Sequence, residues 1–174
     1  MYKCILVSLD GSRSSEAVLP EVENLLKMHP GKVVLLRIGP TVDIDSAAQQ
    51  MEPGVEHAYE LVPDEYDLIV NAGEREIRRY LEAIGERLAQ TGATPIIEVS
   101  FNKPVDEILY FAKYYEADLI AMATHGRSGL ARFLFGSITE NVLRHAPCPM
   151  LVVRTPDSPL PRFAQSSGNN IKVG

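Results

Sequence analysis

The sequence predicts a doubly wound α/β domain, in which a parallel sheet of about five strands carries helices on both faces. Short, uninterrupted apolar runs, such as KCILVSL over 3–9 and KVVLLRI over 32–38, are typical of strands that are buried on both faces. These runs alternate with segments in which apolar residues recur at helical spacing. Because strands and helices alternate, the connections are expected to be right-handed crossovers that keep the strands parallel.

The first part of the chain supplies two strands and the helix between them. The strand at 3–9 is followed by Asp-Gly-Ser and then by a helix that ends at the His-Pro-Gly sequence of 29–31. One face of that helix is apolar and consists of Val18, Val22, Leu25 and Leu26. The second strand, at 32–38, comes directly after it.

An irregular insertion interrupts the alternation from Gly39 to about Tyr66. It contains prolines, glycines and acidic residues without a clear period, and long connections of this kind are more often functional or mobile than filler. Helical periodicity returns from about Leu68 to Gln90, with Gly92 just past the end. The inner face of this long helix is formed by Ile77, Leu81, Ile84 and Leu88.

The last part of the chain completes the sheet. Strands are predicted at 94–101, 118–123 and 150–153. Helices are predicted from Pro104, where a proline in the first turn costs little, and from Ser137 to about His145. Residues 1–154 thus form one α/β domain. Residues 155–174 contain several prolines and a Ser-Ser-Gly-Asn-Asn stretch, which predicts a flexible C-terminal tail.

Composition narrows the class of protein. The net charge of −6 argues against broad binding to nucleic acid or to anionic membranes, since both depend on excess Lys and Arg. No apolar run is long enough for a transmembrane helix, and the N-terminal sequence lacks the features of a signal peptide, so cytoplasmic residence is expected. Cys4 and Cys148 lack the spacing of a zinc site or a redox dithiol, and no metal site is predicted.

Two glycine-containing segments follow the fourth predicted strand. Gly126, Arg127 and Gly129 lie in the connection, and Gly136-Ser137 opens the next helix. Glycines let a ligand approach the backbone, a helix N-terminus favours an anion, and an arginine adds a charged contact, which together suit a triphosphate. The alternative is structural: Ser137 to Glu140 fits a capping box, and the glycines fit turns. Neither G-x-x-x-x-G-K-[ST] nor G-x-G-x-x-G is present.

A second polar segment, Ser8 to Ser12, ends the first predicted strand. Asp10 is suited to accept hydrogen bonds from a base or a ribose, and equally suited to cap the following helix. The carboxyl ends of parallel strands meet at one edge of the sheet, where ligands bind at the point of strand-order reversal. Asp10 and Gly126 therefore meet only if the first and fourth strands are neighbours.

The sequence resembles the universal stress protein family from Tyr2 to Arg154. The stretch ATHGRSGLARFLFGSITENVLRHAPCPMLVV looks like the family's signature, and ILVSLDGS is similar to its opening strand. ATP-binding members carry Gly, two residues, Gly, nine residues, then Gly-Ser or Gly-Thr. Here Gly126 and Gly136-Ser137 match, while Ala123 replaces the first glycine. Asn102-Lys103-Pro104 is a further departure, from Gly-x-Pro.

The resemblance implies a Rossmann-like fold of the adenine nucleotide α-hydrolase-like type and a site for ATP with Mg²⁺. It places Ser8 and Asp10 near the adenine or ribose, with Ile38 packed on the base. It also places Met122, Ala123 and Gly126 under the ribose and phosphates. Gly136, Ser137 and Ile138 are then expected to hold the triphosphate, with Arg127 as an anion contact. Finally, it implies a homodimer through the exposed strand Met150 to Val153.

The implied function is regulatory: a nucleotide-dependent signalling protein of the stress response. No lysine that reaches a terminal phosphate and no base that positions water is evident, so no catalytic residue is assigned. A slow ATPase or autophosphorylation activity stays open. One alternative is a dimeric, chaperone-like module with an empty cleft, which the replacement of the first motif glycine by Ala123 favours. The other is an adenylating enzyme of the same superfamily, whose Ser-Gly-Gly-x-Asp-Ser loop this chain lacks.

Overall fold

Five parallel strands form one sheet in the order β3-β2-β1-β4-β5, as seen in a computed structural model that describes residues 2–39, 63–124 and 136–155. For residues 63–72 it describes the backbone alone. The strands are β1 (Cys4–Leu9), β2 (Lys32–Ile38), β3 (Thr94–Ser100), β4 (Leu119–Thr124) and β5 (Met150–Arg154). The predicted parallel, doubly wound α/β fold is confirmed, and each predicted strand boundary lies within one residue of the observed one.

Strand order reverses between β1 and β4, which are hydrogen-bonded neighbours. Successive strands leave β1 toward β2 and β3 on one side, and β4 and β5 continue the sheet on the other side. Ser8 of β1 is the Cα partner of Met122 in β4 and of Leu36 in β2. The condition set by the sequence, that the first and fourth strands adjoin, is therefore met.

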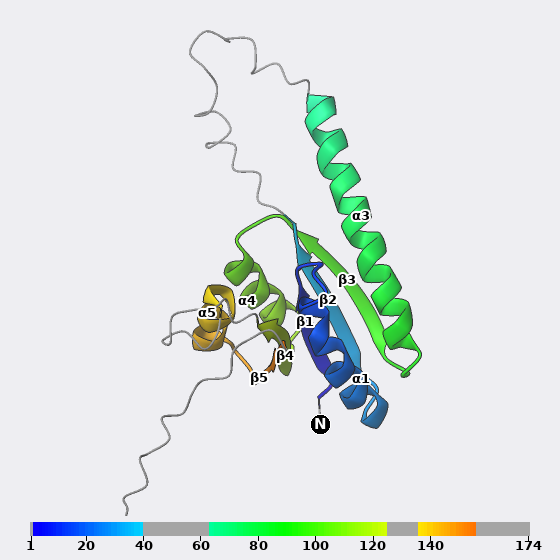
Figure 1. Ribbon diagram of the computed structural model, residues 1–174, viewed down its shortest axis with the longest axis vertical. Helices are drawn as coiled ribbons and strands as arrows, with labels where there is room; N and C mark the ends of the chain where they lie inside the picture. Colours follow the sequence, from blue (N-terminus) through cyan, green and yellow to red (C-terminus); the bar gives the residue numbers. More distant parts are fainter. Residues whose placement is uncertain (1, 40–62, 125–135, 156–174) are drawn as a thin grey trace, which may run out of the picture.

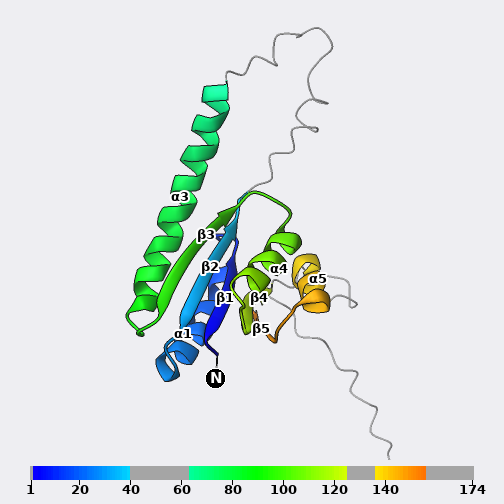
Figure 2. The ribbon, with the colours of Figure 1, turned by 180° about the vertical axis from the view of Figure 1, so that it is seen from behind.

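Helices cover both faces of the sheet (Figures 1 and 2). The 3₁₀ turn η1 (Ser15–Val18), α1 (Leu19–Met28) and α3 (Pro63–Ala89) lie on one face. The other face carries α4 (Pro104–Tyr114) and α5 (Ser137–His145). In the described part of the chain, no helix combines the length and apolarity that crossing a bilayer requires.

The core consists of two apolar layers because successive residues of a strand point to opposite faces. Ile5, Val7 and Leu9 of β1 pack with α1 and α3 in one layer. Cys4 and Leu6 pack with α4 and α5 in the other. The predicted inner faces of the helices are confirmed, except that Leu25 is only partly buried at the border of the first layer.

The long helix α3 begins at Pro63, which corrects two sequence predictions. The helix was expected from about Leu68, and the irregular insertion was expected to reach Tyr66. Proline is favoured at the first helical position. In the sequence, this proline is one of several polar or helix-breaking residues of the insertion, so it does not stand out as a helix start. Residues 40–62 lie outside the described residues, as does the predicted tail from 156 onward.

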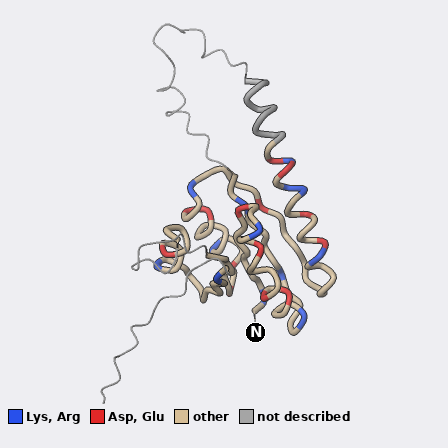
Figure 3. The backbone as a smooth tube through the Cα atoms, in the orientation of Figure 1, with Lys and Arg blue, Asp and Glu red and all other residues tan. Residues whose placement is uncertain are grey.

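Basic and acidic residues follow one another along the described part of α3 (Figure 3). Arg75, Glu76 and Arg79 are exposed, and Arg78 pairs with Glu74 at 3.0 Å. Such exposed i,i+4 pairs contribute about 0.3–0.5 kcal/mol each, so the helix is held mainly by its apolar face.

Candidate functional site

The carboxyl ends of β1 and β4 place the sequence-predicted polar residues at one edge of the sheet. Asp10 follows β1 directly, and Ile38 is the last residue of β2, the strand on the other side of β1. Thr124 ends β4, and its hydroxyl oxygen accepts a hydrogen bond from the N–H of Gly136, at 3.2 Å. This bond fixes the start of α5 at the end of β4.

Among the described residues, no side chain caps the N-terminus of α5. Gly136 is the N-cap residue, and its carbonyl oxygen accepts the N–H of Glu140 at 2.9 Å. Ser137 is the first helical residue and is exposed, so the capping-box interpretation of Ser137 is wrong. The N–H groups of the first turn lack intrahelical partners, and together with the helix dipole they favour an anion.

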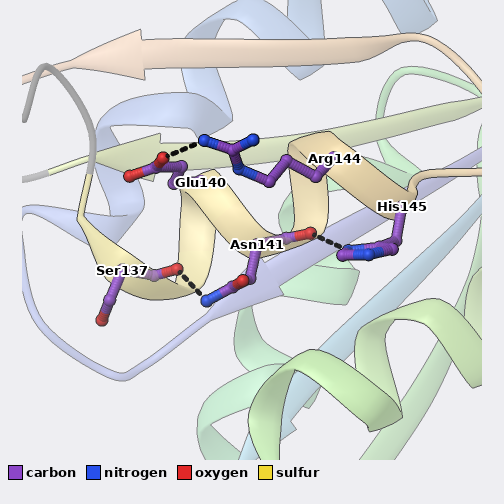
Figure 4. A network of polar contacts seen from close by, with 5 residues as sticks. All are labelled: Ser137, Glu140, Asn141, Arg144 and His145. Atoms are coloured by element: carbon purple, nitrogen blue, oxygen red, sulfur yellow. Dashed lines mark hydrogen bonds and ion pairs between the residues drawn. The ribbon is translucent and has the colours of Figure 1, made fainter.

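Side chains of α5 bond to other residues of the same helix (Figure 4). The Asn141 amide donates to the carbonyl oxygen of Ser137 at 3.0 Å, and Arg144 pairs with Glu140 at 2.7 Å. The His145 Nδ1 lies 2.9 Å from the carbonyl oxygen of Asn141. The charge of Glu140 is thus matched by Arg144, which leaves less negative charge facing an anion at the N-terminus.

Nothing within the described chain requires glycine at position 136. Its φ of −62° and ψ of 156° are open to any residue. A Cβ atom added there would meet no atom within 4 Å. The space in front of the α5 N-terminus is therefore open to a group from outside the described chain.

Asp10 closes a tight turn between β1 and η1. Its carboxylate accepts the N–H of Ser12 at 2.8 Å, and its own N–H donates to the Ser15 hydroxyl oxygen at 3.3 Å. Ser12 makes the cap-like bond, since its hydroxyl oxygen accepts the N–H of Ser15 at 3.1 Å. Of the two alternatives, the helix-capping one therefore applies to Ser12, while Asp10 makes an Asx turn at the exposed edge of the sheet.

Three further residues, which the sequence did not single out, lie against this turn. Arg37 of β2 lies beside Gly11, and its guanidinium carbon is 5.1 Å from the centre of the Tyr80 ring. The Tyr80 hydroxyl donates to Glu16 at 2.9 Å. Burial, followed by the bond to Glu16, raises the pKa of Tyr80 well above its usual value, so its hydroxyl stays protonated.

The remaining predicted residues divide between the two faces of the sheet. Ile38 and Met122 pack with the α4/α5 layer. Ser8, the register partner of Met122, lies two residues after Leu6 in β1 and therefore points to the same face of the sheet as Leu6. Ala123 packs with the opposite layer, so its methyl group points away from Met122. Gly126 and Arg127 lie outside the described residues. The structure thus brings together Ser8, Asp10, Ile38 and Met122 on adjacent strand ends, with Gly136, Ser137 and Ile138 at the adjoining helix start.

The family model described as the universal stress protein family matches residues 1–154. The chain belongs to the universal stress protein family. The match spans all five strands of the sheet.

Among curated universal stress proteins, MJ0531 of Methanocaldococcus jannaschii is similar. It is 30% identical over 156 residues, which cover 90% of this chain and 84% of that protein. Among solved structures, the protein MJ0577 superimposes with a TM-score of 0.66 at 29% identity, covering 91% of this chain and 99% of that one. These likenesses agree with the parallel α/β architecture described above.

Two more distant universal stress protein structures contain a nucleotide. One is a complex with cAMP, at 20% identity and a TM-score of 0.59, covering 88% of this chain and 97% of that one. The other, from Archaeoglobus fulgidus, is a complex with dAMP, at 18% identity and a TM-score of 0.55, covering 87% of this chain and 98% of that one. At these identities the likeness to this chain extends to the fold.

Proposed function

We propose that this universal stress protein binds ATP, carried as its Mg²⁺ complex, at the carboxyl edge of β1 and β4. The triphosphate lies against the N-terminus of α5, at Gly136, Ser137 and Ile138, with Gly126 and Arg127 as further phosphate contacts. The adenosine half lies over Ser8, Asp10, Ile38 and Met122, beside Ala123. Nucleotide complexes of two solved relatives support the choice of ligand class.

The observation that carries the proposal is the open space at Gly136. A glycine in the middle of a fold usually has an internal reason, such as a positive φ or a close backbone contact. Gly136 has neither among the described residues. An anion that approaches the uncapped N–H groups of Ser137 and Ile138 supplies the reason, because a side chain at 136 would stand in its path.

The residues present fit a nucleotide whose metal ion is bound mainly by its phosphates. Within the described ranges, no group of three His, Cys, Asp or Glu side chains is arranged to hold a metal ion. Mg²⁺ keeps several water ligands and commonly binds through phosphate oxygens with one or two carboxylates. When bound, the ion neutralises phosphate charge, which complements the helix N-terminus.

The presence of Ala123 in place of the family's first glycine is compatible with this site. Its methyl group packs with the α1/α3 layer, whereas Ser8, Ile38 and Met122 belong to the opposite side of the sheet. The departure from the family's first glycine therefore leaves the surface formed by these three residues unchanged. This argues against the empty-cleft alternative.

The biological output follows as part of the same proposal. The protein acts in the cytoplasm as a nucleotide-dependent regulator of the stress response, with at most slow ATP hydrolysis. It forms a homodimer through β5, which is an edge strand of the described sheet and whose residues are all partly exposed.

Calorimetric titration of the protein with MgATP tests the proposal. The predicted result is one site per chain with a micromolar dissociation constant. MgGTP tests recognition of the base, and inorganic tripolyphosphate tests the phosphate half alone. Tripolyphosphate is expected to bind more weakly than ATP because it makes none of the adenosine contacts. Absence of binding for all three ligands would contradict the proposal and favour the empty-cleft module.

A further inference from the structure

Arg37 occupies an unusual position for a charged residue. It is the one charged side chain inside the apolar run from Val33 to Ile38 of β2. Its guanidinium group lies flat against the turn that follows β1, because a Cβ atom at Gly11 would be 2.5 to 2.9 Å from three guanidinium atoms. Gly11 also has a φ of +83°, which other residues rarely adopt. Glycine at this position thus serves both the turn and the arginine.

Among the described residues, the surroundings of Arg37 hold it by packing and not by ion pairing. Its Nε atom is buried and makes no hydrogen bond, and none of the ion pairs among the described residues involves Arg37. A buried polar atom without a partner costs stability. The compensating contact is the face of the Tyr80 ring, 5.1 Å from the guanidinium carbon.

Tyr80 extends this contact to the far side of the turn. Its hydroxyl donates to Glu16, which lies in η1 directly after Ser15. The turn is therefore held at two points: Arg37 contacts Gly11 at its start, and Tyr80 contacts Glu16 at its end. Since Tyr80 belongs to α3 and Arg37 to β2, the contacts join three segments that lie far apart in the sequence.

We propose that Arg37, Tyr80 and Glu16 are positioning residues that hold the turn from Asp10 to Ser15 in the conformation that binds adenosine. The inference rests on the proposed function, since it concerns the adenosine half of the same site. The bonds inside the turn are local: Asp10 with Ser12, and Ser12 with Ser15. Arg37, Tyr80 and Glu16, here called the clamp, add contacts from β2 and α3 that oppose opening of these local bonds.

The test compares Arg37→Met with the wild type in two ways. In the nucleotide-free protein, amide hydrogen exchange at Ser12 and Ser15 is expected to become about tenfold faster, because the turn opens more often. Affinity for MgATP is expected to fall about tenfold, while affinity for inorganic tripolyphosphate stays unchanged. A general loosening of the fold would lower the affinity for both ligands. A loss of ATP affinity alone is therefore specific to a positioning role.

Two variants complete the test. Tyr80→Phe keeps the ring under the guanidinium but loses the bond to Glu16, so it is expected to show a smaller effect in the same direction. Arg78→Met is the matched control, because it removes a guanidinium from α3, the helix of Tyr80, and among the described residues Arg78 pairs with the half-exposed Glu74. It is expected to change neither measurement.

Unchanged exchange at Ser12 and Ser15 in Arg37→Met would overturn the inference, as would faster exchange with unchanged ATP affinity. An equal loss of ATP and tripolyphosphate affinity would also overturn it. If the wild type binds no nucleotide, the proposed function fails, and the exchange measurement still decides whether the clamp holds the turn.

Discussion

Replacing Gly136 by valine separates the ligand site from the fold. The backbone angles at position 136 suit valine, and the added Cβ meets no atom of the described residues within 4 Å. The expected loss is that of a poorer N-cap residue, about 0.5–1 kcal/mol. For a domain of this size, that corresponds to a fall in Tm of about 2–4 °C at most.

The effect on ATP binding is expected to be much larger. The isopropyl group stands in front of the first-turn N–H groups of Ser137 and Ile138, which are proposed to donate to phosphate. Hydrogen bonds to a charged group are worth about 1.5–3 kcal/mol each. Loss of two such bonds therefore predicts a fall in affinity of at least about 100-fold.

Calorimetry with MgATP and thermal unfolding measure the two effects on the same sample. Gly73→Val is the matched control, because a Cβ at Gly73 also meets no described atom within 4 Å, but Gly73 lies within α3. It is expected to leave affinity unchanged and to stabilise the helix slightly, since valine has the better helix propensity. ATP affinity of Gly136→Val within threefold of the wild type would refute the reasoning.

Three other predictions concern single side chains. Thr124→Val removes the acceptor of the Gly136 N–H, so we expect about 1–3 kcal/mol lower stability in urea and several-fold weaker ATP binding; unchanged values would show that this bond does not hold α5. The hydrogen bond that the Tyr115 hydroxyl donates to the Glu98 carboxylate raises the pKa of Tyr115 to about 12. Because this lies above the unfolded value of about 10, the stability that the bond contributes is full below pH 10 and is lost as pH rises toward 12. Tyr115→Phe should therefore lose less stability over this range in alkaline unfolding experiments, and an identical loss would contradict the assignment. Burial raises the pKa of both Cys4 and Cys148, but Cys4 is 5% exposed whereas Cys148 is partly exposed. Iodoacetamide should thus alkylate Cys148 first, and equal rates from the start would contradict the packing of β1.

The fold could be predicted from the sequence because its signals are local and repeated. Continuous apolar runs define β1, β2 and β4, and helical spacing defines the inner face of α3. The start of α3 could not be predicted as well. Pro63 lies among polar residues, and its role as a first helical residue depends on a helix that packs only from about Ile77 onward within the described side chains.

The candidate site was predicted less completely than the fold. Asp10 and Gly136 were found because turn residues at strand ends have a strong local pattern. Arg37 was missed, although one charge within an apolar run was a usable signal. Its contact with Tyr80 joins residues that are 43 positions apart, since 80 − 37 = 43. Such contacts depend on tertiary packing and have no local pattern.

The central claim is that a nucleotide binds where β1, β4 and α5 meet, and an NMR titration with MgATP tests it most directly. Amide shifts are predicted at Asp10, Ser12, Ser137 and Ile138, while His29, at the opposite edge of the sheet, stays unchanged. Shifts confined to other surfaces, or none at saturating ATP, would contradict the account.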